Sequence, residues 1–135
     1  MADETSIRLK VFSPNRVFFD GEADLVEFTT TEGDIGVYRN HIPLTVVVAP
    51  GVLRITKDGE TREATLLDGF ATILPDEIVV LSEACEWPEE IDINRAEEAR
   101  IRAERRMKSD SEANYTRAEL ALRRALIRLR LAGKE

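Results

Sequence analysis

The chain has 135 residues, which leaves room for one average domain or for a modest domain with an appendage. Its formal net charge of −7 argues against a general nucleic-acid binder. A single cysteine, Cys85, excludes an internal disulfide, and a single histidine, His41, lacks the companions of a zinc site, so metal hydrolysis and catalytic triads are not expected.

Short β-strands are predicted for the part of the chain before Trp87. Ile7, Leu9 and Val11 alternate with charged residues, which is the period of a strand with one buried face. Further β-branched and aromatic runs follow at 17–19, 25–30, 46–48, 52–56, 63–67, 70–74 and 78–81. Many short strands with no helical period between them predict an antiparallel β-sandwich.

Two dipeptides predict particular turns between these strands. Asp58-Gly59 fits a two-residue hairpin loop. Asp68-Gly69 marks a tight turn between the runs on either side of it.

The pattern changes from strands to helices at Pro88, which ends strand pairing. Asp92 is a predicted N-cap for a helix that runs to about Lys108. Residues 108–111 then break the helical pattern and offer an N-cap for a second helix, which ends at Gly133. Because the loop between them is short, the two helices should pair antiparallel.

Alanine is predicted to line the seam between the helices. At about 100° per residue, a stripe made mostly of alanine forms on each helix: Ala96, Ala99, Ala103 and Met107 on the first, and Ala118, Ala121, Ala125 and Ala132 on the second, with Leu122, Leu126 and Leu129 beside them. Such a seam buries little area, so the hairpin should be marginal unless something else holds it. Leu120, Ile127 and Leu131 form a further apolar patch, which predicts more than one partner for the second helix. The predicted fold class is therefore α+β, with an antiparallel β-sandwich domain at 1–87 and a two-helix hairpin domain at 88–135.

Charge is distributed unevenly along the chain. Residues 1–88 carry 7 basic and 16 acidic side chains, whereas residues 89–135 carry 12 and 10. From Tyr115 to Lys134 there are six basic residues and one acidic residue, and this basic tail favours an acidic partner surface or a phosphate ligand. No apolar run approaches the roughly 18 residues of a membrane span and no signal-peptide pattern is visible, so we expect a cytoplasmic protein.

Two constellations carry candidate functional residues, and the first is the segment 33–44. Its glycines permit turns and its proline stiffens the chain. We expect Ile42 and Leu44 to anchor this loop on the sandwich and Asp34 and His41 to point outward. The alternative is a structural turn with a surface histidine.

The second constellation combines the start of the first helix, at Asp92, with arginines. A helix N-terminus offers free amide donors, and arginine forks suit phosphate oxygens. One edge of the seam would collect four arginines: Arg95, Arg102, Arg124 and Arg128. Because the chain has no Gly-x-x-x-x-Gly-Lys loop, a nucleotide bound here would be sensed and not hydrolysed. The alternative is a solvated helix edge with ion pairs such as Glu119 to Arg123.

Six segments, spread over nearly the whole chain, carry a family resemblance. They are Ile7 to Ser13, Glu32-Gly33-Asp34-Ile35-Gly36-Val37, His41-Ile42-Pro43-Leu44, Asp68-Gly69-Phe70, Ile91-Asp92-x-x-Arg95-Ala96 and Arg117-Ala118-Glu119-Leu120-Ala121-Leu122-x-Arg124-Ala125. In this order and spacing they resemble the epsilon subunit of bacterial F-type ATP synthases.

The resemblance implies a non-catalytic subunit of a proton-translocating complex, with no catalytic residue and no metal. Its sandwich would bind the gamma subunit and the loops of the membrane c-ring and turn with them in the central stalk. Rotation would thereby be coupled to ATP synthesis in the head. Asp34 and His41 match family positions near the c-ring loops. The chain would be peripheral, at the cytoplasmic face of the bacterial inner membrane, associated with the membrane only through the complex and without a nucleic-acid partner.

The resemblance also implies two regulatory roles for the hairpin. Unfolded along gamma it would reach the alpha and beta subunits and inhibit ATP hydrolysis; the candidates for contact with an acidic segment of beta are Arg117, Arg123, Arg124 and Arg128. No cofactor is required, but in some relatives the folded hairpin binds regulatory ATP. The positions that match the ATP-binding residues of those relatives are Glu86, Asp92, Arg95, Ala96, Arg102, Arg117, Arg124 and Arg128.

Other functions remain open from the sequence. The chain could be chiefly a nucleotide-responsive regulator of the ATPase, with rotor coupling secondary. A basic-helix module would bind RNA or anionic membranes with a steep salt dependence. A free-standing enzyme is disfavoured because no nucleophile–base pair or metal cluster is visible.

Overall fold

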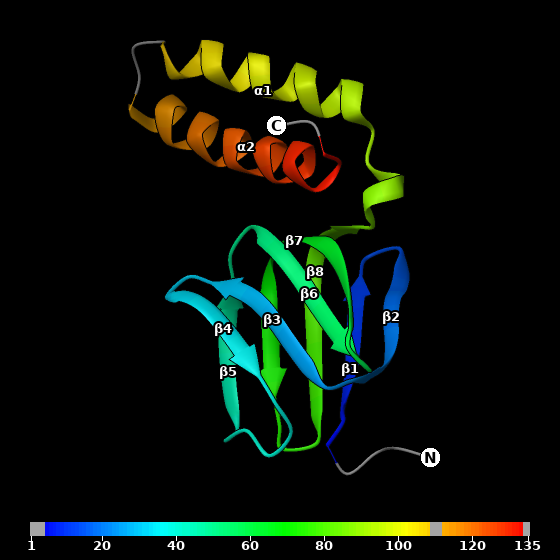
Figure 1. The fold of residues 1–135 in the computed structure, drawn as a ribbon. Coiled ribbons are helices and arrows are strands. Elements are labelled where there is room, and N and C mark those ends of the chain that lie inside the picture. The colour runs from blue at the N-terminus through cyan, green and yellow to red at the C-terminus, as the bar shows by residue number, and fades with distance from the viewer. Residues whose placement is uncertain (1–4, 109–111, 134–135) are drawn as a thin grey trace. The chain divides into compact units, whose positions relative to one another are not determined.

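The computed structural model describes residues 5–108 and 112–133. The chain divides into two units, Met1–Cys85 and Glu86–Glu135. The first unit is a β-sandwich and the second holds two helices packed together, which confirms the predicted α+β fold class (Figure 1). The N-cap predicted within 109–111 lies outside the described residues.

Eight strands make up the sheet of the first unit: β1 (Ile7–Ser13), β2 (Arg16–Ala23), β3 (Leu25–Thr30), β4 (Gly33–Val37), β5 (Leu44–Val48), β6 (Gly51–Lys57), β7 (Glu60–Ile73) and β8 (Glu77–Glu86). Their order is β2-β1-β8-β7-β5-β3-β4, and β6 pairs with both β3 and β7. β1 and β8 run parallel, whereas the pairs β1–β2, β3–β4, β3–β5, β3–β6, β5–β7 and β6–β7 are antiparallel. A parallel pair cannot be joined by a tight turn and needs a long connection. Here β1 and β8 are the first and the last strand of the unit, and strands β2 to β7 lie between them in the sequence.

The core of the sandwich consists of large apolar side chains that alternate with exposed ones. Ile7, Leu9 and Val11 are fully buried, as their alternation predicts. The other strands contribute Val26, Phe28, Val37, Val48, Leu53, Ile55, Leu66, Ile73, Ile78 and Val80. Burial of so much aliphatic and aromatic area is the main favourable term in the folding of this unit.

The prediction of a loop at residues 33–37 was wrong, because these residues form strand β4. Val37 pairs with Val26 and Gly33 with Thr30, so the whole segment runs beside β3. The turn lies one step earlier, where the Glu32 amide donates to Thr30 Oγ1 at 3.1 Å. Of the two glycines, only Gly33 has a positive φ, of 117°, and it follows that turn directly.

The prediction that Asp68-Gly69 forms a turn between two strands was wrong. The dipeptide lies within one continuous strand, β7, and kinks it. Asp68 and Gly69 have φ values of 49° and 140°. Before the kink β7 pairs with β6, and from Gly69 onward it pairs with β5. Left-handed dihedrals therefore serve here to redirect a strand between two partners. By contrast, Asp58-Gly59 forms the predicted two-residue hairpin loop between β6 and β7.

The second unit contains a short 3₁₀ turn, η1 (Pro88–Glu90), and the helices α1 (Ile93–Met107) and α2 (Glu112–Leu131). The helices run antiparallel, as predicted (Figure 1). Past the end of α2, Gly133 has a φ of 80° and its amide donates to the Arg130 carbonyl oxygen at 3.0 Å. This confirms the predicted helix stop, because a left-handed glycine is a common C-terminal cap.

Replacing Gly69 with alanine should destabilise the sandwich by about 3 kcal/mol or more, because an added Cβ would lie 1.9 Å from the Leu81 carbonyl oxygen. Urea denaturation followed by circular dichroism measures this loss. The matched control is Gly59→Ala, which also sits at positive φ but meets nothing within 4 Å. It should cost only about 1 kcal/mol. Equal losses in the two variants would contradict the role of the close approach to β8.

Candidate functional site

The seam between α1 and α2 is lined by alanine, as predicted. The buried side chains are Ala96 and Ala103 on α1 and Ala118, Ala125 and Leu129 on α2. The neighbouring positions Ala99, Met107, Ala121 and Leu122 are half-buried. Outside the seam, Leu120 and Leu126 remain 37% and 47% exposed, so α2 shows apolar side chains on more than one side.

The start of α1 is fixed by a series of capping contacts. The Trp87 amide donates to Glu90 Oε1 at 2.9 Å across η1. Asp92 then caps the helix, since its Oδ1 accepts from the Arg95 amide at 3.0 Å, which confirms the predicted N-cap. The cap ties down one amide donor of the first turn and leaves this end with the positive pole of the helix dipole.

An ion pair joins the first residue of the second unit to the last part of helix α2. Arg128 Nε donates to Glu86 Oε1 at 2.6 Å, and the two side chains are 29% and 27% exposed. The residues are separated by 42 positions in the sequence. Because the helices are antiparallel, Arg128 near the end of α2 lies at the same end of the hairpin as Asp92. The structure thus brings together three of the expected nucleotide-site residues.

The remaining expected residues are distributed along the hairpin. Ala96 is buried in the seam, whereas Arg95 on α1 is exposed close to the Asp92 end. Arg124 is half-buried one turn before Arg128. Arg102 and Arg117 are exposed near the other end of the hairpin. Most of the expected residues therefore lie at the end of the hairpin where α1 begins and α2 ends. This end combines the backbone amides of the first turn of α1, the Asp92 carboxylate and guanidinium groups.

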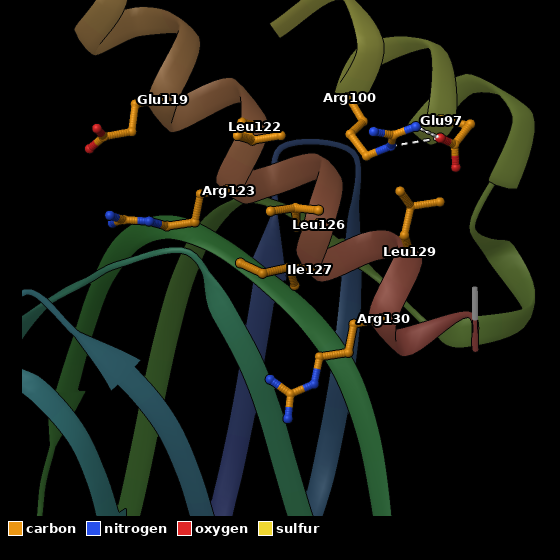
Figure 2. A pocket seen from close by; sticks show the side chains of 9 residues that line it. All are labelled: Glu97, Arg100, Glu119, Leu122, Arg123, Leu126, Ile127, Leu129 and Arg130. Carbon is orange, nitrogen blue, oxygen red and sulfur yellow. Dashed lines mark hydrogen bonds and ion pairs between the residues drawn. The ribbon is translucent and has the colours of Figure 1, made fainter. Parts of the chain in front are cut away.

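A groove of about 850 Å³ lies on the hairpin and combines apolar and charged side chains (Figure 2). Its lining consists of Glu97, Arg100, Glu119, Leu122, Arg123, Leu126, Ile127, Leu129 and Arg130. In Figure 2, Arg123 and Arg130 extend from α2 away from α1. Arg123 lines this groove, and Arg128 is not among its lining residues.

Charge within this groove is partly compensated on α1. Arg100 donates to the carboxylates of Glu97 and Glu104, one turn before and one turn after it. The hydrogen bond to Glu97, followed by that to Glu104, raises the pKa of Arg100 above its ordinary value. The i,i+3 and i,i+4 spacing was the sequence signal for this cluster, which the sequence analysis missed. The ion pair expected between Glu119 and Arg123 is absent from the described part of the hairpin.

On the sandwich, Asp34 and His41 lie on different elements. Asp34, in β4, is exposed and its Oδ1 accepts from Thr29 Oγ1 at 2.7 Å. His41 follows β4 and is half-buried, with Nδ1 2.7 Å from the Ile42 carbonyl oxygen. In the described ranges no hydrogen bond joins the two residues.

The expected anchors of the segment after β4 were wrong, because Ile42 is 73% exposed and Leu44 is 40% exposed. Polar contacts hold the segment instead. Arg39 Nη1 donates to the Ser6 carbonyl oxygen at 3.1 Å, and the Asn40 amide donates to the Pro75 carbonyl oxygen at 2.6 Å. The apolar side chains that could have served as anchors are thus presented to solvent beside His41.

A second hollow, of about 500 Å³, lies on the sandwich where the β7 kink meets β1, β5 and β8. Its lining includes Phe70, Leu81 and Val47, which are 58%, 54% and 44% exposed. Exposed apolar side chains gathered at one place are typical of a protein-binding surface.

Two negative findings apply to the described ranges, 5–108 and 112–133. No helix there is long and apolar enough to cross a membrane. Nor does that part of the chain bring three or more His, Cys, Asp or Glu side chains together as candidate metal ligands.

Models of one protein family match both units in succession. The beta-sandwich domain of "ATP synthase, Delta/Epsilon chain" matches residues 6–88, and the long alpha-helix domain of the same family matches residues 89–133. The chain belongs to the ATP synthase epsilon chain family. The epsilon chain is a non-catalytic subunit of the ATP synthase, which confirms the resemblance read from the sequence segments.

Individual epsilon chains match over nearly their whole length. That of Caldanaerobacter subterraneus subsp. tengcongensis is 44% identical over 133 residues, which cover 97% of this chain and 96% of that one. That of Ruminiclostridium cellulolyticum is 47% identical over 122 residues, which cover 90% and 91%. Both units thus occur together in these epsilon chains.

Solved ATP synthases contain chains of the same fold. One lies in the Euglena gracilis mitochondrial ATP synthase, in a structure of OSCP, F1 and c-ring, with a TM-score of 0.81, 23% identity, and coverage of 94% of this chain and 81% of that one. Another lies in the central stalk and c-ring structure of the Tetrahymena thermophila mitochondrial ATP synthase, with a TM-score of 0.69, 13% identity, and coverage of 93% and 96%. At these identities the likeness concerns the fold alone.

Removing the Asp92 cap should loosen the start of α1. Asp92→Ala leaves the Arg95 amide without its acceptor and should cost about 1 kcal/mol of local stability. Amide hydrogen exchange of the first turn of α1 measures this loss. Asp92→Asn keeps an acceptor oxygen and should stay within a few tenths of a kcal/mol of the parent. Faster exchange in both variants alike would show that the charge, and not the cap, stabilises this end.

Proposed function

We propose that this chain is the epsilon subunit of the central stalk of a proton-translocating F-type ATP synthase. It turns with the rotor and couples rotation of the c-ring to ATP synthesis in the head. The observation that carries the proposal is the match of both units, in order and over nearly the whole chain, to the epsilon chain family. The subunit is peripheral, at the cytoplasmic face of the bacterial inner membrane, and is held there by the complex.

The sandwich is the part that binds the gamma subunit and the c-ring loops. The hollow with Phe70, Leu81 and Val47 supports a protein partner on this unit, since it exposes apolar side chains that a partner would cover. Asp34 and His41 are the proposed c-ring contacts. The exposed side chain of Ile42, next to His41, supports a contact at that place.

The hairpin is the regulatory part and inhibits ATP hydrolysis by reaching the alpha and beta subunits. The proposed contacts with an acidic segment of beta are Arg117, Arg123, Arg124 and Arg128. The alanine seam supports a hairpin that can open, because its buried side chains are small. The apolar side chains of Leu120 and Leu126 outside the seam support a second packing partner for α2.

Regulatory ATP binds the compact hairpin and favours it over the open form. The proposed ligand set is Glu86, Asp92, Arg95, Ala96, Arg102, Arg117, Arg124 and Arg128. The position of Arg128 at the same end as the α1 N-terminus supports a phosphate site, since both offer N–H donors there. The binding is regulatory only, and ATP is not consumed.

A chain that ends at Trp87 should still assemble into the complex and support ATP synthesis, because it keeps the proposed gamma and c-ring contacts. Inhibition of ATP hydrolysis should be lost, and the hydrolysis rate of the purified complex should rise several-fold. Membrane vesicles that carry the truncated or the full chain measure both activities. Loss of ATP synthesis on truncation, with assembly intact, would contradict the assignment of coupling to the sandwich.

The isolated chain should bind ATP with a dissociation constant between about 1 µM and a few mM. Arg124→Ala should weaken binding about tenfold or more, because a charge-assisted hydrogen bond to phosphate is lost. Isothermal titration calorimetry measures both. Arg105→Ala, which removes an exposed arginine from the last turn of α1, is the matched control and should leave affinity unchanged. If both substitutions weakened ATP binding equally, the loss would be due to the change in net charge, and a specific role of Arg124 would be contradicted.

A further inference from the structure

The segment 38–43, which follows β4, is tied to the sandwich by two polar contacts at neighbouring positions. Arg39 Nη1 donates to the Ser6 carbonyl oxygen at 3.1 Å, across 33 positions of the sequence. The Asn40 amide donates to the Pro75 carbonyl oxygen at 2.6 Å. The segment is thus held both to the residue directly before β1 and to the turn between β7 and β8.

Both contacts have firm support. Ser6 is only 1% exposed, and its Oγ donates to Glu22 Oε2 at 3.0 Å, so the acceptor of Arg39 is itself fixed. The bond from the Arg39 guanidinium to this carbonyl oxygen is charge-assisted, and the Arg39 side chain is half-buried. Asn40 has a φ of 69°, in the left-handed region that asparagine adopts more readily than most residues. The backbone therefore leaves residues 39 and 40 in a defined direction.

Two apolar side chains of this segment are exposed, although the sandwich has an apolar core. Ile42 is 73% exposed and Tyr38 is 64% exposed. On a loose loop an isoleucine would lower its exposure by folding back onto the sheet, because burial of apolar area is favourable. The contacts at 39 and 40, together with the fixed φ of Pro43, oppose that movement. Ile42 is therefore held outward, and a side chain that is already held loses less entropy when a partner covers it.

We propose that Arg39 is a positioning residue for the c-ring contact, which binds the Ser6 carbonyl oxygen and thereby holds Ile42 outward to pack against a c-ring loop. This inference rests on the proposed c-ring binding by the sandwich. Ile42 directly follows His41, a proposed c-ring contact, so one partner loop would cover both side chains. Arg39 acts here through Ile42, since its own Nη1 is bound to the sandwich.

The affinity of the chain for two assemblies tests this inference. One is the head with its gamma subunit, detached from the c-ring, and the other is the complete complex; both are first depleted of the epsilon subunit. Only the complete complex offers the c-ring loops. Fluorescence titration with the full chain, labelled at its N-terminus, measures a dissociation constant for each assembly. The wild-type chain should bind the complete complex more tightly.

Arg39→Ala should weaken binding to the complete complex about fivefold and leave binding to the detached head within about twofold of the wild type. Arg39→Lys keeps a cationic donor and should give an intermediate loss; it also serves as the milder test if the alanine variant does not fold. Ile42→Ala should weaken binding to the complete complex about as much. In that background Arg39→Ala should change affinity less than about twofold, because the side chain that it positions is gone.

The matched control is Arg16→Ala, which removes an exposed arginine from the other end of the β1–β2 pair. It should leave the ratio of the two dissociation constants unchanged. Far-UV circular dichroism of each variant confirms that the sandwich is folded.

Three outcomes would contradict the inference. Equal weakening toward both assemblies by Arg39→Ala would show that Arg39 stabilises the sandwich as a whole. Additive losses in Arg39→Ala and Ile42→Ala would show that Arg39 does not act through Ile42. Either result would overturn the inference while c-ring binding stands. A wild-type chain that binds both assemblies equally would overturn both the inference and the proposed c-ring contact.

Discussion

Short side chains at the contact between α1 and α2 limit the stability of the hairpin, and its proposed regulatory role depends on this limit. Ala96, Ala103, Ala118 and Ala125 are buried there, and among the described side chains of the two helices only Leu129 adds a large one to the buried set. An alanine seam lets two helices pack but removes little apolar area from water. The Asp92 cap and the Glu86–Arg128 ion pair therefore carry a larger share of the hairpin's stability than such contacts carry in the sandwich, whose core is aliphatic and aromatic. A hairpin held in this way suits a regulatory element, because a ligand or a partner can shift its equilibrium with a few contacts.

Much of the fold could be predicted from local patterns. The run at 25–30 coincides with β3, and Asp92 caps α1 where its position before the helical pattern indicated. The errors arose where a residue type has two uses. Glycine in the segment 33–37 suggested a turn, but the segment forms a strand because it pairs with β3. Asp68-Gly69 supplies left-handed dihedrals that suit a turn equally well as a kink, and only the pairing of β7 with both β6 and β5 distinguishes the two.

The candidate site could be predicted less well, because it depends on contacts between distant residues. Helical spacing placed Arg128 beside the seam, yet no local pattern indicates that Glu86, 42 positions earlier, would bind its Nε. Spacing also grouped Arg124 with Arg128 on one edge of the seam, but it gave no sign of the groove that Arg123 lines. On the sandwich, Ile42 looked like an anchor because it is apolar, but polar contacts hold that segment and leave Ile42 in solvent. Residue type and period indicate which face of a helix or strand a side chain occupies, but they do not indicate which residue it contacts.

Native-state amide hydrogen exchange of the isolated chain tests the central claim, that the alanine seam leaves the hairpin free to open while the sandwich stays folded. The amides of α2 around Ala125 should exchange through an opening whose free energy lies about 3 kcal/mol or more below that of the amides of β3 around Phe28. The exchange of α2 should also depend less steeply on denaturant, since opening the seam exposes little area. If both groups of amides exchanged with the same free energy and the same denaturant dependence, the two units would unfold together and the account would be contradicted.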